Sequence, residues 1–170
     1  MYEKIKSLAK QYYPETVAIR RDLHKYPEQG WLEMRTASLV AKKLEKLGYQ
    51  VLIGKEIMCE EYRMGVPDQE ILESNYQRAI SQGADPYYIK KVKDGFTAVA
   101  GILKNGSGPV VAIRFDMDAL CIEEDDSINH NPGKFGFISC NQGTMHACGH
   151  DGHVAIGLTV AKILSNIKDS

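Results

Sequence analysis

The chain has 170 residues, 21 Lys and Arg against 22 Asp and Glu, and a formal net charge of −1. A chain of this length can bury a hydrophobic core without disulfides, and its 44% hydrophobic and 25% charged residues are ordinary for a folded domain. The near-zero charge argues against nucleic acid or an anionic membrane as a partner. No apolar run reaches the roughly 20 residues of a membrane-spanning helix. The charged N-terminus lacks the apolar core of a signal peptide, so we expect a cytoplasmic protein whose four cysteines are free thiols or metal ligands.

The first half of the chain is predicted to be mainly helical. The pattern over residues 2–26 is helical, with an interruption at Pro14. Residues 37–47 carry apolar side chains at helical spacing, and Gly48 stands where a left-handed cap is expected. Residues 49–53 then predict a short strand.

The second half combines helical and strand patterns. Residues 55–95 predict a helical insertion within one domain that spans the chain, with helices starting at Asp68 and at Asp85. Residues 95–103 and 109–115 are rich in β-forming side chains and flank a turn sequence, which predicts a β-hairpin.

The last predicted helix starts near Asp151 and follows a long loop over residues 121–144. Loops of this length in compact domains are usually functional. The order of the elements predicts an α/β domain in which helices cover a mixed sheet.

The stretch MHACGHDGH, residues 145–153, carries the strongest chemical signal. Four of its side chains are of types that bind transition metals at neutral pH: His146, Cys148, His150 and His153. If the stretch before the helix is extended, the first three share one face. Asp151 can cap the helix or accept a hydrogen bond from a ligating imidazole. The alternative is a helix start that is rich in histidine by chance, with Cys148 as a small buried side chain.

A second candidate lies at the end of the apolar run 110–115, where the chain reads RFDMDAL. Strand ends are where open α/β sheets place ligands, and Asp116 and Asp118 point the same way if the strand continues. Their carboxylates are expected either to bind a metal or orient an imidazole, or to form only a polar turn.

Three stretches together resemble the metal-dependent amidohydrolase and carboxypeptidase family, which includes hippurate hydrolase and N-acyl-amino-acid amidohydrolases. They are RRDLHKYPEQGW (20–31), RFDMDAL (114–120) and MHACGHDGH (145–153). Residues 68–101 are most similar to the aminobenzoyl-glutamate hydrolase subgroup. The resemblance implies the N-terminal part of a three-layer αβα catalytic domain, without the family's dimerisation domain.

The resemblance also implies a chemistry. Cys148 and His150 correspond to metal ligands, and Asp118 to the aspartate that orients the metal cluster. Asp116, His146, Asp151 and His153 are further candidates for binding the metal or supporting its ligands. The expected reaction is hydrolysis of the amide bond of N-acyl or N-aminobenzoyl amino acids by water that a divalent Zn, Mn, Ni or Co ion activates, with a glutamate as general base.

The sequence departs from the family pattern in two ways. Cys121 stands where the motif usually has proline. The chain also ends at Ser170, before the family's glutamate pair and later histidine ligands. We therefore expect little activity from the chain alone, and either self-association or a second chain that completes the site. The alternatives are an inactive fragment that serves as an oligomerising or metal-binding module, and a thiol enzyme using Cys148, which the absence of a C-x-x-C pair disfavours.

Overall fold

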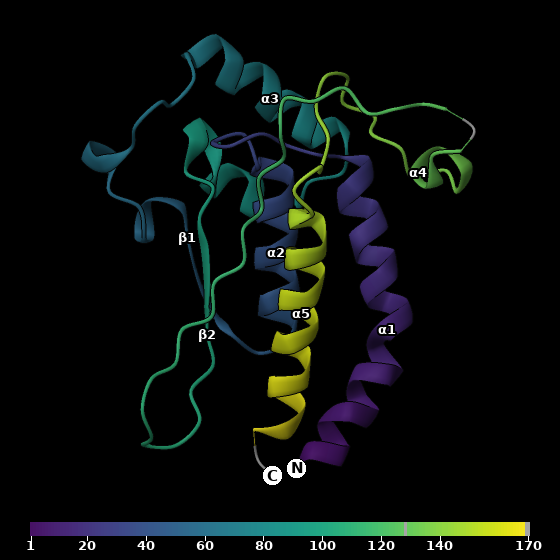
Figure 1. The fold of residues 1–170 in the computed structure, drawn as a ribbon. Coiled ribbons are helices and arrows are strands. Elements are labelled where there is room, and N and C mark those ends of the chain that lie inside the picture. The colour runs from purple at the N-terminus through teal and green to yellow at the C-terminus, as the bar shows by residue number, and fades with distance from the viewer. Residues whose placement is uncertain (128, 169–170) are drawn as a thin grey trace.

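Three long helices form the body of the molecule. The computed structural model describes residues 1–127 and 129–168, and its long helices are α1 (Tyr2–Lys25), α2 (Met34–Lys46) and α5 (His150–Ile167). Helix α5 packs lengthwise against α1 and also contacts α2, and the start of α1 and the end of α5 lie at the same end of the molecule (Figure 1). The opposite end of α5, where the helix starts, is surrounded by loops.

Helix α1 runs without a break, so the predicted interruption at Pro14 is wrong. Proline costs a helix one backbone hydrogen bond and strains the preceding turn. Here packing against α5 compensates: Thr16 and Thr159 share a 2.6 Å hydrogen bond between the two helices, and Ile19 and Leu23 pack with Val154 of α5.

A two-stranded antiparallel sheet lies beside α2. Strand β1 (Gln50–Ile53) pairs with β2 (Val99–Ile102), with Val51 opposite Gly101. The segment between the strands is largely helical, as predicted. It holds α3 (Gln69–Ser81) and the 3-10 helices η1 (Gly54–Glu56), η2 (Glu60–Tyr62), η3 (Tyr88–Lys91) and η4 (Lys93–Gly95).

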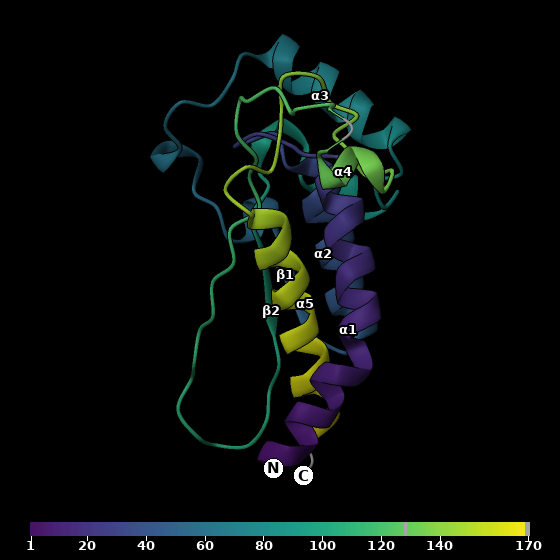
Figure 2. The ribbon, with the colours of Figure 1, turned by 45° about the vertical axis from the view of Figure 1, so that its right-hand side comes forward.

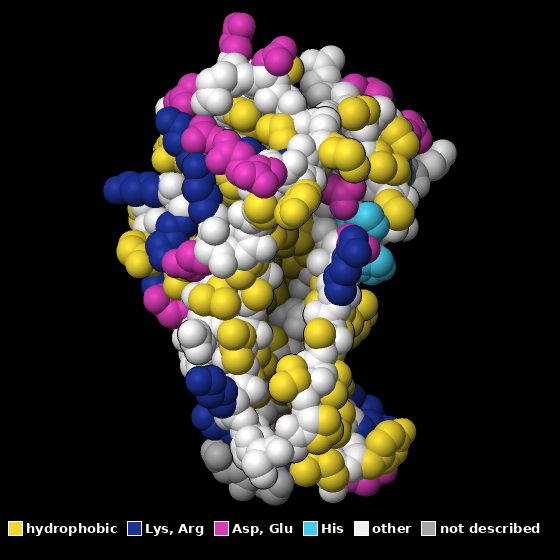
Figure 3. Space-filling view, turned by 90° about the vertical axis from the view of Figure 1, so that its left-hand side faces the viewer, with side chains coloured by type: hydrophobic (Ala, Val, Ile, Leu, Met, Phe, Trp, Pro, Cys, Tyr) yellow, Lys and Arg dark blue, Asp and Glu magenta, His cyan; other side chains and the backbone are white. Residues whose placement is uncertain are grey.

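The predicted hairpin between residues 95–103 and 109–115 is wrong. Strand β2 takes β1 as its partner, and residues 109–115 form no strand. The chain after β2 instead swings away from the sheet in a wide loop (Figure 2). Its apolar side chains are left in solvent, with Val110 97% and Val111 79% exposed. Figure 3 shows hydrophobic side chains along both sides of a hollow on this face.

The hydrophobic core lies between α2 and the β1–β2 region and fixes the loops above α5. Met34, Ala37 and Ala41 of α2 are fully buried against Ile53 and the helical insertion. Met117 packs against this cluster and also against the smaller one between α1 and α5. The aspartates on either side of Met117 are thereby held near the start of α5.

This arrangement is that of a partial α/β domain, as the sequence predicts. Short bridges extend the strand pairing toward the site: Gln29 pairs with Ala119 in parallel, and Leu120 pairs with Met145 antiparallel. Among the described residues, none of the helices has the length and apolar character needed to span a membrane.

Candidate metal centre

The start of α5 is built from a tight turn. The amide of Gly149 donates to the carbonyl of His146 at 3.3 Å, and Gly149 itself has φ of +82°, which glycine adopts without strain. The stretch is therefore not extended, and the expectation that His146, Cys148 and His150 share one face by alternation is wrong. His146 and Cys148 line one cavity, whereas His150 is grouped with other side chains.

His150 is the best oriented of the predicted ligands. Its Nδ1–H donates to the backbone carbonyl of Asp118 at 2.9 Å and to the Asp118 carboxylate at 3.0 Å. This leaves Nε2 with a free lone pair, which is the arrangement that metal-binding histidines usually show. The Asp118 carboxylate thus contacts this imidazole, and orienting an imidazole was one of the roles considered for the pair Asp116 and Asp118.

Asp116, His150 and His153 bring three potential ligand atoms together. One carboxylate oxygen and one nitrogen of each ring all lie within 4.8 Å of one another. The two rings lie 5.0 Å apart between centroids, because residues three apart occupy the same helix face. Asp116 also pairs with the exposed Arg114, whose Nη2 lies 2.8 Å from Oδ1. Imidazole and carboxylate are donors that suit a divalent transition metal.

Cys148 lies outside this group of three. All four cysteines are free and exposed, which fits the expectation of unpaired thiols. Cys148 instead lines a cavity of about 530 Å³ on the side of α1, together with Arg20, His24, His130 and His146.

His146 is a buried and unsatisfied member of the same motif. It is 4% exposed, and neither ring nitrogen has a hydrogen-bond partner among the described residues. Burial lowers the pKa of His146 to about 4, so the ring is neutral at pH 7. A neutral imidazole with unused nitrogens, lining a cavity, can bind a ligand group that enters from that side.

Asp151 holds His24 and not a metal-binding imidazole. His24 Nδ1 donates to Asp151 Oδ2 at 2.7 Å, and Arg20 Nε lies 2.8 Å from the same oxygen in an ion pair. Burial by itself raises the pKa of Asp151, but the hydrogen bond from His24 and the charge of Arg20 hold it below its usual value. The ionised Asp151 thus ties the first turn of α5 to α1.

The second nitrogen of His24 binds another buried carboxylate. His24 Nε2 donates to Glu124 Oε1 at 2.8 Å, and the same oxygen also accepts a bond from His130. Burial lowers the pKa of His24, but its bonds to Asp151 and Glu124 outweigh burial and raise it above 6.5. Since both ring nitrogens donate, His24 is a buried imidazolium between two carboxylates.

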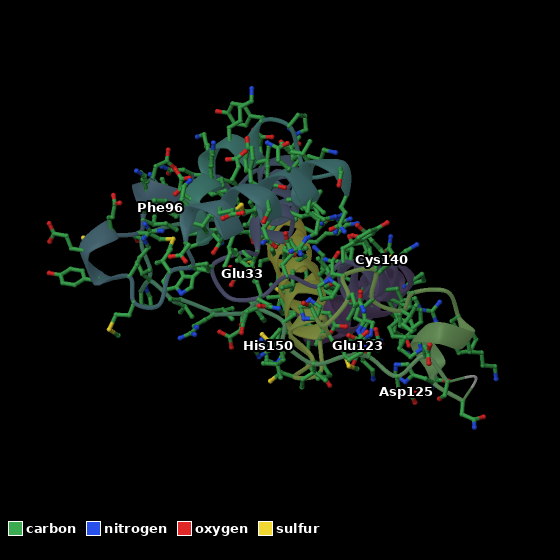
Figure 4. The ribbon with its side chains drawn as sticks, turned by 90° about the horizontal axis from the view of Figure 1, so that it is seen from above. Glu33, Phe96, Glu123, Asp125, Cys140 and His150 are labelled. Carbon is green, nitrogen blue, oxygen red and sulfur yellow. The ribbon has the colours of Figure 1, made fainter. Side chains whose placement is uncertain are left out.

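Two further buried glutamates support the loop that carries the aspartates. Glu28 is fully buried and accepts hydrogen bonds from the amides of Arg35 and Thr36 at the start of α2. Its own carbonyl accepts from Ala119, next to Asp118. Glu33 accepts a 2.8 Å bond from Thr97, and burial raises its pKa to about 7. In Figure 4, which is seen from above, Glu33 and His150 both lie near the middle of the view, whereas Asp125 lies toward its edge.

Most of this supporting network was not predicted from the sequence. His24 and Glu28 lie in the stretch 20–31, whose pattern by itself is that of a charged helix end before a proline. Nothing local in the sequence indicates that Glu124, 100 residues from His24, is its partner. The only signal was the resemblance, which includes this stretch.

The chain is similar in sequence to a family of peptidases and to several hydrolases. Residues 112–170 match the model for peptidase family M20/M25/M40. The chain is 45% identical over 98% of its length to a p-aminobenzoyl-glutamate hydrolase subunit of Escherichia coli. It is 47% identical over 94% of its length to indole-3-acetyl-aspartic acid hydrolase of Enterobacter agglomerans. It spans only 38% and 37% of these two relatives, respectively.

Solved structures show the same relationship. The aminobenzoyl-glutamate utilization protein of Klebsiella pneumoniae is 36% identical with a TM-score of 0.76, over 95% of this chain and 34% of that one. A dinuclear metal binding peptidase of the M20 family from Bacillus subtilis is 30% identical with a TM-score of 0.59, over 92% of this chain and 32% of that one.

Proposed function

We propose that this chain is part of a metal-dependent amide-hydrolysing enzyme of peptidase family M20/M25/M40, whose model matches residues 112–170, and that it supplies one part of that enzyme's metal site. The observation that carries the proposal is His150. Its Nδ1 is fixed by Asp118, and its Nε2 is left free at the start of α5. Such an orienting contact is typical of a metal-binding histidine.

The proposed substrate is a small N-acyl or N-aminobenzoyl amino acid. Support comes from the two relatives above, one named for hydrolysis of p-aminobenzoyl-glutamate and one for hydrolysis of indole-3-acetyl-aspartic acid. The cavity beside Cys148 is about 530 Å³ and is partly lined by Arg20 and His130, so it can receive a ligand of this size and its carboxylate.

The proposed metal ligands in the complete enzyme are Cys148 and His150. When bound, a divalent metal supplies an activated water and polarises the amide carbonyl. Asp118 holds His150 in position, and the Asp151–His24–Glu124 network fixes the turn that carries both ligands. Three protein ligands and an open position are typical of catalytic zinc, so a further ligand and the general base are proposed to come from another segment.

We propose that this segment lies in a second polypeptide or in further chain of the kind the longer relatives have. The chain spans about two fifths of those relatives. The E. coli relative is named as one subunit of its hydrolase, which is compatible with assembly from several chains. The second candidate, an inactive metal-binding module, is supported by the same histidine cluster and differs only in lacking turnover.

The test is reconstitution. This chain is co-expressed with the part of the E. coli relative that it does not match, and hydrolysis of p-aminobenzoyl-glutamate is measured by release of p-aminobenzoate. We expect activity that chelation removes and zinc or manganese restores, and that is absent with Cys148→Ser or His150→Asn. A stable complex that binds metal but shows no turnover would favour the inactive module.

A further inference from the structure

We propose that Asp116, His150 and His153 form a cation site through which this chain on its own binds a divalent transition metal, without the Cys148 thiolate. The inference rests on the proposed function, because it assigns His150 the same role as a ligand. The inference differs from the proposed function in the ligands that bind the metal together with His150 when no other segment completes the site.

The geometry already approaches coordination. Donor atoms around an ion at about 2.1 Å lie roughly 3.0–3.4 Å apart in tetrahedral or octahedral geometry. The three atoms of this group lie within 4.8 Å of one another, so their separations must shorten by at most about 1.8 Å. His153 is exposed and Asp116 is only partly buried, so side-chain rotation can supply this movement while His150 stays in place.

The two histidines are well placed for joint ligation. His150 and His153 are three residues apart in the first turn of α5, and their ring planes are tilted by 30°. His150 donates from Nδ1 to Asp118, which leaves Nε2 to face a metal. Asp116 comes from the loop that Asp118 anchors, so the third donor is positioned by the same contact.

The local charge allows a cation despite the helix start. The N-terminus of a helix carries partial positive charge and disfavours a metal ion. The carboxylates of Asp116 and Asp118 oppose this effect. Arg114 contacts only Oδ1 of Asp116, and its side chain is 89% exposed, so the pair is weak and Oδ2 stays available.

The Cys148 thiolate is not part of this group. Among the described residues, the donor atoms that converge within 4.8 Å are those of Asp116, His150 and His153. Cys148 lies on the exposed turn before α5. Since one imidazole lone pair binds one ion, a Cys148–His150 site and the three-residue site compete for His150. The isolated chain is expected to favour the arrangement that already supplies three donors.

The test is a titration of the tag-free, reduced chain with Co²⁺, followed by absorbance and calorimetry. Cobalt bound by imidazole and carboxylate gives weak visible bands, whereas a thiolate ligand adds an intense near-ultraviolet charge-transfer band. We expect one Co²⁺ per chain, no thiolate band, and an affinity within about twofold in Cys148→Ser. We expect losses of about 10-fold or more in Asp116→Asn and His153→Gln, and a larger loss in His150→Asn.

Controls separate loss of ligand from loss of fold. Far-ultraviolet circular dichroism checks every variant, and Glu60→Gln, which removes an exposed carboxylate of η2, is expected to keep the wild-type affinity. The spectrum of the unaltered chain is decisive even if a variant does not fold. A thiolate band that disappears in Cys148→Ser would overturn this inference and leave the proposed ligands of the complete enzyme standing. No binding by the unaltered chain would also overturn it, while the reconstitution assay would still test the proposed function.

Discussion

Replacement of His24 by asparagine tests whether the buried network holds α5 in place. The change removes an imidazolium that bridges Asp151 and Glu124 with bonds of 2.7 and 2.8 Å. Loss of one partner from a buried ion pair costs about 3–5 kcal/mol. Arg20 still contacts Asp151, and the amide of Ser139 still donates to Glu124, so the lower end of this range applies.

We therefore expect the free energy of unfolding to fall by about 3 kcal/mol, which lowers Tm by roughly 6–12 °C for a chain of this length. Thermal unfolding followed by circular dichroism at pH 6 measures this change. The matched control is His153→Asn, an exposed histidine of α5, which should change stability by no more than about 0.5 kcal/mol.

The pH dependence gives a second check on the same network. The pKa of His24 is raised in the folded chain, so its contribution to stability is fully present below the unfolded value of about 6.5. The contribution is lost as pH rises through the raised folded pKa. The difference between wild type and variant should shrink above pH 7. A difference below about 2 °C at pH 6, or one that grows with increasing pH, would refute the role given to His24.

Other predictions concern single buried sites and the metal. Burial raises the pKa of Glu33 from 4.5 to about 7, so this carboxyl costs the folded chain roughly 3 kcal/mol as pH rises through that range. The free energy of unfolding in urea should therefore depend less on pH between pH 5 and 8 in Glu33→Gln than in the wild type. Parallel pH curves for the two proteins would contradict this prediction. Gly54→Ala places a Cβ 2.2 Å from the backbone oxygen of Lys91. It should lower the free energy of unfolding by well over the roughly 1 kcal/mol expected for Gly65→Ala, where φ is similarly positive but no atom lies close to the added Cβ. Equal Tm values for the two alanine variants would show that this close contact relaxes freely. Chelation of divalent metal should abolish activity of the reconstituted enzyme and leave Tm of the apo chain unchanged, and activity that survives chelation would contradict metal dependence.

Local patterns predicted the helices well. Helices α2 and α3 follow apolar spacing, and Asp85 accepts hydrogen bonds from Tyr87 and Tyr88 just before the predicted second start, which proves to be a 3-10 helix. The start of α5 near Asp151 was also predictable, because Gly149 and the histidine-rich turn mark it. These features depend on interactions within a few residues, which the sequence displays directly.

Long-range pairing could not be predicted in the same way. The turn at residues 104–108 is a good hairpin signal, yet β2 pairs with β1, about 50 residues earlier in the chain. The network around His24 likewise joins residues 100 and 127 positions apart. Charged side chains near a helix end usually face water, so only tertiary packing reveals that these are buried.

In the candidate site, too, local features could be predicted from the sequence and long-range contacts could not. His150 was a candidate ligand from its motif, whereas its contact with Asp118, 32 residues earlier in the chain, was not predicted. The meeting of Asp116 with His153 was not predicted as a set, because it depends on the turn at Gly149 and on the path of the loop before Asp118. A single sequence gives the types of donors but not which of them converge.

The central claim, that this chain binds a divalent metal through His150, is tested most directly by anomalous scattering. Crystals of the chain grown with zinc are measured on both sides of the zinc absorption edge. The account predicts an anomalous peak about 2.1 Å from Nε2 of His150. A map with no peak at His150, from crystals in which that side chain is well ordered and zinc is in excess, would contradict it.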